Sequence, residues 1–369
     1  MQKINCKGCF GLAFVSNMFP SDDFPNYGIF VKNTADLLLQ NGCEVQANIS
    51  IKGRTERKLK KIFNYFSLYC KLLFGLMNSR LRIFYIHYFG FYSLPIILLL
   101  KLFNKKVIVN IHGRDLLGMY PITRSLQKKI VDWVDLFILP SKYFEDVFLK
   151  IFNFGKEKIF IYPSGGINMD VFKPMDKKRL RKSLGFSEAF SIGYVSHLNN
   201  NKGWKVFLEA VEGFKASIED QRLNVIVVGF GQNETEFRQH LAESNIKNEL
   251  IWFKKVDQKK LSELYNSMDV FIFPTRAEES LGLVGLEAMA CGVPVIGSEI
   301  GCLPYYIKSG YNGFLAKAGD SNDFCAKLRA FYSLHEERRR EMSLACLATA
   351  NCFQGDRETK KLLERMKEL

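Results

Sequence analysis

The sequence lacks an apolar run long enough to cross a membrane. A bilayer-spanning helix needs about 20 consecutive apolar residues. The apolar run Phe89–Leu100 is shorter than this and is interrupted by Gly90 and Pro95. We therefore predict a buried helix for this run and no transmembrane segment.

Cysteines are present, but without a pattern that indicates disulfides or a metal site. There are nine, an odd number, scattered along the chain. Cys6 and Cys9 have Cys-x-x-Cys spacing, but no second pair follows, which disfavours a zinc or redox site. The N-terminus has no signal-peptide pattern, so we expect reduced thiols in a cytoplasmic protein.

A complete dinucleotide-binding motif is also missing. Gly229-Phe230-Gly231 supplies the first two glycines of Gly-x-Gly-x-x-Gly, but Glu234 occupies the place of the third. The third glycine allows close packing of helix and strand in such sites. We therefore do not expect NAD binding.

The composition is that of a basic globular protein. A chain of 369 residues suffices for about two domains, and 47% hydrophobic residues with 32 phenylalanines exclude a disordered chain. The net charge of +14 predicts attraction to anions such as nucleotides or lipid headgroups. The basic residues form no recognisable nucleic-acid motif, so a nucleic-acid partner is not expected.

Short β-rich segments alternate with segments of helical periodicity, which predicts an α/β fold. The basic, proline-containing segment 173–182 predicts a linker. We therefore expect two Rossmann-like domains facing each other across a cleft, an N-terminal one over 1–172 and a C-terminal one over 173–352. The expected strands cover 11–16, 106–111, 136–139, 159–162, 191–195, 225–228, 250–253, 270–273 and 293–296.

The most informative stretch, 273–320, contains two carboxylates eight positions apart. Glu279 and Glu287 flank a turn at Gly282, and a helix is expected over 286–291. The N–H groups at a helix start bind anions, and glycine lets a diphosphate approach the backbone. A carboxylate on the first turn can bind a ribose through two hydroxyls. Taken alone, the pattern is also compatible with a glutamate cap and a solvated glutamate.

A histidine follows one of the expected buried strands. His112, Gly113 and Asp115 come directly after the run 106–111. Polar residues at the carboxyl end of a strand are site candidates in an open α/β sheet. A single histidine is more often structural, but the neighbouring glycine and aspartate favour a functional role.

The segment Arg54–Leu76 alternates basic residues with large apolar ones. This pattern is typical of a basic amphipathic helix that lies in a membrane surface. A core-packing helix with a solvated basic face would show the same pattern. The sequence alone leaves both interpretations open.

Several segments together resemble one family. The sequence is similar to retaining glycosyltransferases of the GT-B fold in family 4 (glycosyl transferases group 1), which contains many bacterial polysaccharide and lipid-glycan enzymes. The most specific match is EESLGLVGLEAMACGVPVIGSEIG at 278–301, which carries the paired glutamates. The other matches are FP…GIFV near Gly28, IHGRD at 111–115, PSGGINMDVFKP at 163–174 and HLNNNKG at 197–203.

The resemblance implies roles for residues of the second domain. Glu279 would face the donor sugar and stabilise positive charge at its anomeric carbon, and Glu287 would hold the nucleotide ribose. Lys202 would neutralise the leaving diphosphate. The backbone N–H groups that would bind the diphosphate are those around Gly282, Leu283 and Val284.

It also implies roles for the first domain and the tail. His112 would bind the donor sugar from the opposite domain, and Gly28 would let the first loop approach the phosphates. The tail 353–369 would be the helix that crosses back to the N-terminal domain.

The chain departs from the family pattern at one position. His197 stands where an arginine usually precedes the lysine by five residues, so diphosphate binding is expected to be weaker or pH-dependent. An Asp-x-Asp pair for a divalent cation is absent. We therefore expect no cofactor and a metal-independent enzyme that uses Lys202, the helix N-terminus and His197.

These features predict sugar transfer, with retention, from a nucleotide-diphosphate sugar to a glycan or polyprenyl-diphosphate-linked acceptor in surface polysaccharide synthesis. The enzyme would be cytoplasmic and could be peripheral on the inner face of the membrane, through Arg54–Leu76. Two alternatives remain. One is a GT-B-fold epimerase, and the other is a catalytically silent sugar-nucleotide-binding subunit, which the histidine at 197 favours.

Overall fold

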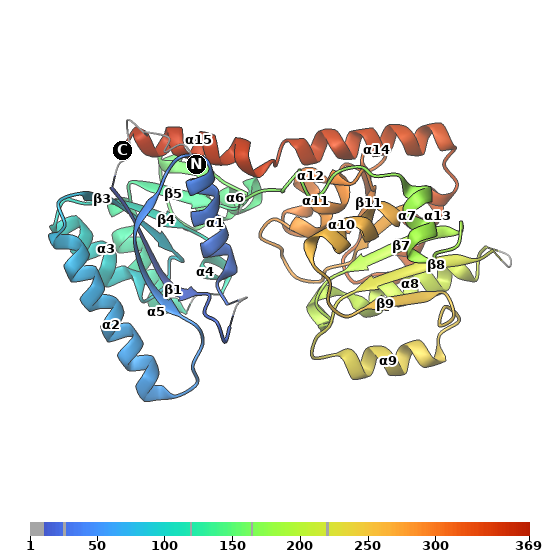
Figure 1. The fold of residues 1–369 in the computed structure, drawn as a ribbon, viewed down its shortest axis with the longest axis horizontal. Coiled ribbons are helices and arrows are strands. Elements are labelled where there is room, and N and C mark those ends of the chain that lie inside the picture. The colour runs from blue at the N-terminus through green and yellow to red at the C-terminus, as the bar shows by residue number, and fades with distance from the viewer. Residues whose placement is uncertain (1–10, 25–26, 119, 164, 219–220) are drawn as a thin grey trace. The chain divides into compact units, whose positions relative to one another are not determined.

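The chain folds into two compact α/β units, seen as a ribbon in Figure 1. The computed structural model describes residues 11–24, 27–118, 120–163, 165–218 and 221–369. Unit 1 comprises Met1–Gly166 and Gly355–Leu369, and unit 2 comprises Ile167–Gln354. The chain thus enters unit 2 six residues before the expected boundary at 172/173. Cys6 and Cys9 lie outside the described residues.

Unit 1 contains one six-stranded sheet with the strand order β2-β1-β3-β4-β5-β6, in which every neighbouring pair is parallel. Its elements are β1 Gly11–Phe19, α1 Ile29–Gln40, β2 Val45–Lys52, α2 Lys58–Met77, β3 Leu81–His87, α3 Ser93–Leu102, β4 Lys106–Asn110, α4 Arg114–Leu117, α5 Pro121–Ile130, β5 Leu136–Leu139, α6 Lys142–Ile151, β6 Ile159–Ile161 and α15 Gly355–Lys367.

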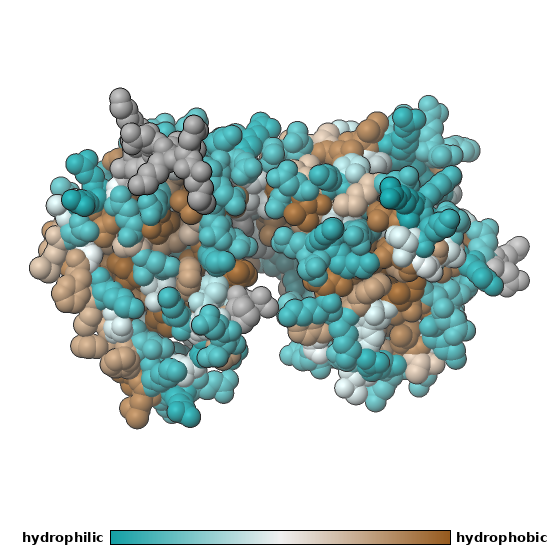
Figure 2. Space-filling model, in the orientation of Figure 1, coloured by the Kyte–Doolittle hydropathy of each residue, from teal (hydrophilic) through white to brown (hydrophobic). Residues whose placement is uncertain are grey.

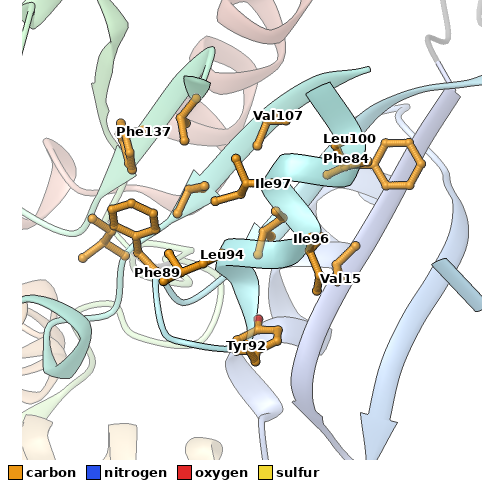
Figure 3. Packing of buried hydrophobic residues seen from close by; sticks show 14 of the residues in the cluster. Val15, Phe84, Phe89, Tyr92, Leu94, Ile96, Ile97, Leu100, Val107 and Phe137 are labelled. Carbon is orange, nitrogen blue, oxygen red and sulfur yellow. The ribbon is translucent and has the colours of Figure 1, made fainter. Parts of the chain in front are cut away.

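Both faces of this sheet are covered by helices. Successive strand residues point to opposite faces, and each face carries apolar side chains that helices bury. Ala13 and Val15 of β1 belong to a core shared with α2, α3 and α6, and Figure 3 shows α3 side chains packed against this face. Leu12 and Phe14 belong to a second core, which α1 and α15 close from the other side. Leu362 in α15 is fully buried there. The prediction that the C-terminal helix returns to the first domain is confirmed.

Unit 2 repeats this architecture with the strand order β12-β11-β10-β7-β8-β9, again parallel throughout. Its elements are α7 Lys177–Leu184, β7 Phe190–Val195, α8 Trp204–Lys215, β8 Leu223–Val228, α9 Glu234–Glu243, β9 Leu250–Phe253, α10 Gln258–Ser267, β10 Val270–Phe273, α11 Leu283–Ala290, β11 Val295–Ser298, α12 Leu303–Tyr306, β12 Gly313–Ala316, α13 Ser321–Tyr332 and α14 Glu336–Asn351.

The expected strands all occur, but β2, β3 and β12 were not predicted. The helix expected from Leu286 begins three residues earlier, at Leu283, and the strand expected from Val293 begins at Val295. Among the described residues, no helix combines the length and the apolar character that crossing a membrane requires.

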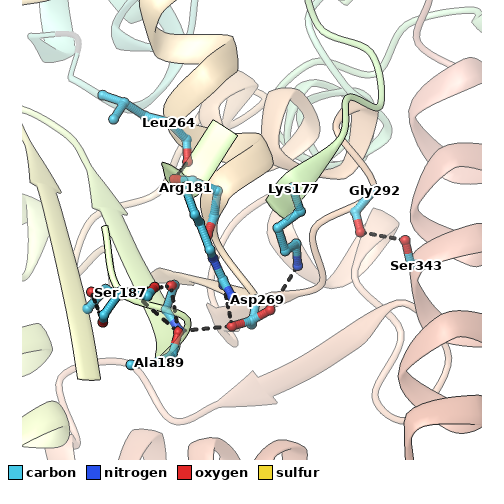
Figure 4. A network of polar contacts seen from close by, with 11 residues as sticks. Lys177, Arg181, Ser187, Ala189, Leu264, Asp269, Gly292 and Ser343 are labelled. Atoms are coloured by element: carbon cyan, nitrogen blue, oxygen red, sulfur yellow. Dashed lines mark hydrogen bonds and ion pairs between the residues drawn. The ribbon is translucent and has the colours of Figure 1, made fainter. Parts of the chain in front are cut away.

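The prediction of a linker over 173–182 is wrong, because α7 begins within this segment. Asp176 caps α7 by accepting a hydrogen bond from the backbone N–H of Arg179 (3.0 Å). The run of basic residues looks solvated in the sequence, yet Arg181 is buried and its Nη2 lies 2.6 Å from Asp269 Oδ2. Lys177 reaches the other oxygen of the same carboxylate at 2.8 Å (Figure 4).

Asp269 therefore holds α7 on the second sheet, and its replacement should destabilise unit 2. Asp269→Ala leaves the guanidinium of Arg181 buried without its charge partner, which costs about 3 kcal/mol. Lys177→Ala, whose side chain is 42% exposed, is the matched control and should cost less than about 1 kcal/mol. Urea unfolding can be followed by the fluorescence of Trp204 and Trp252, both in unit 2. Equal losses in the two variants would contradict the assignment.

Candidate functional site

The loop after β7 carries Lys202 at the carboxyl edge of the second sheet. Residues Asn200–Lys202 form a 3-10 turn, which Asn199 caps by accepting a hydrogen bond from the backbone N–H of Lys202 (3.2 Å). The carbonyl oxygen of Asn201 accepts a hydrogen bond from the backbone N–H of Arg276 (2.7 Å), and the Thr275 hydroxyl lies 3.2 Å from the same oxygen. This loop is therefore fixed to the loop that follows β10.

Only glycine fits at the end of the Lys202 loop. Gly203 has φ 69°, and a Cβ there would lie 1.8 Å from the carbonyl oxygen of Pro274. Glycine alone tolerates both this conformation and this approach. The contact places the Lys202 side chain beside the segment that carries Glu279.

Lys202 and Glu279 form an ion pair. The Lys202 ammonium lies 2.6 Å from Glu279 Oε1, with the two side chains 28% and 15% exposed. The buried Thr275 hydroxyl donates to the same oxygen (2.9 Å). Because Oε1 receives both bonds, Oε2 is the oxygen that we expect a ligand to meet.

Helix α11 begins directly after Gly282. This residue is the N-cap with φ 75°, and a Cβ would lie 2.9 Å from both the Phe273 ring and the Tyr306 hydroxyl. The first N–H groups of a helix have no intrahelical partner. The earlier helix start thus places the N–H groups of Leu283 and Val284 in the first turn, where an anion binds best.

Glu287 lies one turn further along α11 and is largely buried. The Tyr265 hydroxyl donates to its Oε2 at 3.3 Å. Burial raises the pKa of Glu287 to about 7, although this hydrogen bond opposes the shift. The carboxyl is therefore poised to change its ionisation near neutral pH.

His197 is exposed in the same loop as Lys202. Its Nδ1 lies 3.4 Å from the carbonyl oxygen of Phe230, and its ring packs edge-on against the Phe230 ring at 5.4 Å. A carbonyl oxygen only accepts, so Nδ1 must carry the proton in this contact. The neutral ring then has a lone pair at Nε2, and only the protonated ring has an N–H there for an anion.

In unit 1, Asp115 fixes the backbone around His112. Its carboxylate accepts hydrogen bonds from the N–H groups of His112 (3.0 Å), Gly113 (2.8 Å) and Phe89 (3.0 Å). Burial nevertheless raises the pKa of Asp115 to about 6. The His112 ring packs on Phe30 of α1, with 4.5 Å between centroids.

A second, fully buried histidine contacts His112. His87 Nδ1 lies 3.2 Å from His112 Nε2, and the rings stack with an angle of 14°. Burial lowers the pKa of His112 to about 3, and burial together with the neighbouring His112 lowers the pKa of His87 well below its usual value. In such a contact one neutral imidazole donates and the other accepts, so the tautomers of the two rings depend on each other.

Gly28 is the N-cap of α1 and has a structural reason to be glycine. Its φ is 72°, and a Cβ would lie 2.8 Å from the carbonyl group of Met18. Phe30, two residues on, is the residue on which His112 packs. The two unit 1 residues predicted to contact the donor are therefore linked through Phe30.

Comparison with known families finds a match for most of unit 2. Residues 176–344 match the model of the family described as "Glycosyl transferases group 1". This segment is a glycosyl transferases group 1 domain. It contains Lys202, Glu279, Gly282 and Glu287, the residues that carried the resemblance in the sequence.

Curated relatives agree with this placement. The chain is 28% identical over 244 residues to N-acetyl-alpha-D-glucosaminyl L-malate synthase from Bacillus anthracis, covering 64% of this chain and 62% of the relative. It is 31% identical over 207 residues to D-inositol 3-phosphate glycosyltransferase from Geodermatophilus obscurus, covering 54% and 45%. The matches thus span less than two thirds of these relatives' own length.

Solved structures share the whole fold. A glycosyltransferase from Rickettsia africae ESF-5 is 18% identical with a TM-score of 0.78, covering 96% of this chain and 98% of that one. Anabaena HepE in complex with UDP is 16% identical with a TM-score of 0.76, covering 97% and 100%. The chain therefore has the GT-B fold of these glycosyltransferases.

The structure brings together part of the predicted site and adds residues to it. Within the glycosyl transferases group 1 domain, Lys202 contacts Glu279 directly. Thr275, Tyr265 and His87 were missed, because no spacing in the sequence relates them to their partners. Among the described residues, no three His, Cys, Asp or Glu side chains gather as metal ligands would.

The buried histidine pair gives a test of the candidate residues of unit 1. We expect both rings to stay neutral at pH 5, whereas histidines of the urea-unfolded chain titrate near 6.5. NMR of the protein labelled at histidine reports each ring. A midpoint near 6.5 for His87 or His112 would show that the pair is solvated.

Overall stability is a poor readout of the same pair. Between about pH 3 and 6.5, His112 is protonated in the unfolded chain but neutral in the folded one. This residue therefore lowers the free energy of unfolding as the pH falls. The raised pKa of Asp115 acts in the opposite sense over an overlapping range. The NMR measurement avoids this cancellation.

Proposed function

We propose that the chain transfers a sugar from a nucleotide-diphosphate sugar to the hydroxyl of a glycan or lipid-linked oligosaccharide, with retention of configuration and without a metal. The Lys202–Glu279 ion pair beside the start of α11 is the observation that carries the proposal. It unites a cation for the leaving diphosphate with a carboxylate for the sugar.

The proposed chemistry follows from charge. The bond between the anomeric carbon and the diphosphate oxygen breaks, a bond from the acceptor oxygen to that carbon forms, and the proton of the acceptor hydroxyl passes to the departing diphosphate. Negative charge grows on the diphosphate, where Lys202 and the first N–H groups of α11 would stabilise it. Positive charge grows on the anomeric carbon, where Glu279 would stabilise it.

The name of one relative supports a nucleotide sugar as donor and a lipid-linked sugar as acceptor. The name of a Corynebacterium glutamicum relative, 30% identical over 210 residues, describes a GDP-mannose-dependent mannosyltransferase acting on a phosphatidylinositol mannoside. We propose a nucleotide sugar as donor and a polyprenyl-diphosphate-linked glycan as acceptor. The enzyme would work in the cytoplasm, at the inner face of the membrane, in surface polysaccharide synthesis.

Donor identity and activity can be tested one after the other. A thermal-shift panel of UDP-glucose, UDP-N-acetylglucosamine and GDP-mannose identifies the donor, since ligand at a hundredfold its Kd adds about 2.7 kcal/mol to stability. Slow release of free sugar from that donor supports an enzyme. Binding without any release would instead support the silent subunit.

The two glutamates should differ in what they bind. We expect Glu279→Gln to lower turnover at least about 100-fold while changing the Kd of the nucleotide diphosphate little, because its partner is the sugar. We expect Glu287→Ala to raise that Kd about tenfold. Calorimetry with UDP or GDP measures the Kd, and the exposed neighbour Glu278→Gln is the matched control. Equal losses of diphosphate affinity in both variants would contradict the division of roles.

Donor binding should depend on pH through Glu287. Ribose hydroxyls favour the ionised carboxylate, so this residue tightens binding as the pH rises through about 7. The affinity of intact nucleotide sugar should therefore rise with pH in the parent, and Glu287→Gln should remove this rise. A profile of the same shape in Glu287→Gln would show that Glu287 does not titrate with the donor.

A further inference from the structure

Helix α2 has two apolar faces, and the fold uses one of them. Leu68, Leu72 and Leu76 are buried against the first sheet. The opposite side carries large apolar side chains in solvent, which Figure 2 shows as brown surface along the edge where Figure 1 places α2. The exposed residues are Leu59 (83%), Ile62 (68%), Phe63 (67%), Phe66 (64%), Leu73 (48%), Phe74 (74%) and Met77 (78%).

These residues form one continuous stripe rather than scattered positions. Leu59, Phe63, Phe66, Leu73 and Met77 are separated by steps of three, four or seven residues, which keeps them on one side of a helix. Ile62 and Phe74 widen the stripe. A helix of 20 residues is about 30 Å long, so the stripe is too extended to be chance exposure.

The helix is also strongly basic. Lys58, Lys60, Lys61 and Lys71 are all exposed, and α2 contains no acidic residue. An apolar stripe flanked by lysines alone is the composition of helices that lie in the interface of an anionic bilayer. The charge therefore distinguishes between candidate occupants of the stripe.

A second copy of the chain is the main competitor. The alternating steps of three and four would suit a helix pair. Two copies of α2 would, however, bring lysines near lysines with no carboxylate on either helix to offset them. An anionic lipid surface buries the same stripe and neutralises the same lysines.

We propose that the outer face of α2 is a docking surface for an anionic lipid bilayer, with the helix parallel to the membrane and Phe63, Phe66 and Phe74 in the acyl boundary. The sequence left two interpretations of this segment open, a core-packing helix and a helix that lies in a membrane surface. The inner face of α2 packs against the sheet, and the exposed outer face is the one that we propose for the membrane. The docking is independent of sugar transfer, because lipid binding requires no donor.

Vesicle flotation of the full chain tests the proposal. Phosphatidylcholine vesicles with 30% phosphatidylglycerol should bind the protein at least tenfold better than pure phosphatidylcholine, and 0.5 M salt should reduce the binding because it screens the lysines. Phe63→Glu/Phe66→Glu should lose at least tenfold, and so should Lys60→Glu/Lys71→Glu. Leu344→Glu, at an exposed leucine of unit 2, and Lys247→Glu are matched controls that should bind as the parent does.

All substituted side chains are exposed, so circular dichroism should show a parent-like fold in each variant. Equal recovery with neutral and anionic vesicles, or unchanged binding by the phenylalanine variant, would overturn the proposal. Sedimentation gives the competing outcome: a dimer that dissociates on Phe63→Glu/Phe66→Glu, without vesicle binding by the parent, would assign the stripe to a second copy. Either failure leaves the donor and turnover experiments unaffected.

Discussion

The approach of the Lys202 loop to the loop after β10 determines the charge arrangement of the candidate site. Gly203 permits a backbone contact that any Cβ would block, and the carbonyl oxygen of Asn201 joins the two loops by accepting a hydrogen bond from the backbone N–H of Arg276. Lys202 is thereby held beside Glu279, 77 residues away in the chain. Without this contact, the lysine and the carboxylate would be two flexible side chains, one in the loop after β7 and the other in the loop after β10.

Burial decides the charge state of the other ionisable groups. Glu287, Asp115 and the two neighbouring histidines all have pKa values displaced toward the neutral form. The half-shielded Lys202 and Glu279 instead form an ion pair, in which each member offsets the charge of the other. Such a pair can replace its own contact with contacts to a ligand that carries positive charge at one atom and negative charge at another. A nucleotide sugar would be such a ligand while the bond between its anomeric carbon and its diphosphate breaks.

The two units use the same sheet architecture but differ at their surfaces. Both sheets are covered on two faces, so their central strands are mostly apolar and carry little information about partners. In unit 2 the informative residues lie in loops at the carboxyl ends of the strands. In unit 1 a second informative feature is a helix, α2, whose outer face is more apolar than packing against a sheet requires.

The sequence by itself determined the α/β class, most strands of both sheets, the family resemblance and the candidate glutamates Glu279 and Glu287. Periodicity and local motifs depend only on residues that are close together in the chain. The strands β2, β3 and β12 were not predicted, although Val45–Lys52 alternates apolar and polar residues throughout and β12 has only four residues, and α7 was missed because its basic run conceals the buried Arg181. Nor did the sequence relate Thr275 to Glu279, Tyr265 to Glu287 or His87 to His112. Those pairings and the pKa values that follow from them depend on which side chains the fold brings into contact and removes from water, and only the tertiary structure decides that.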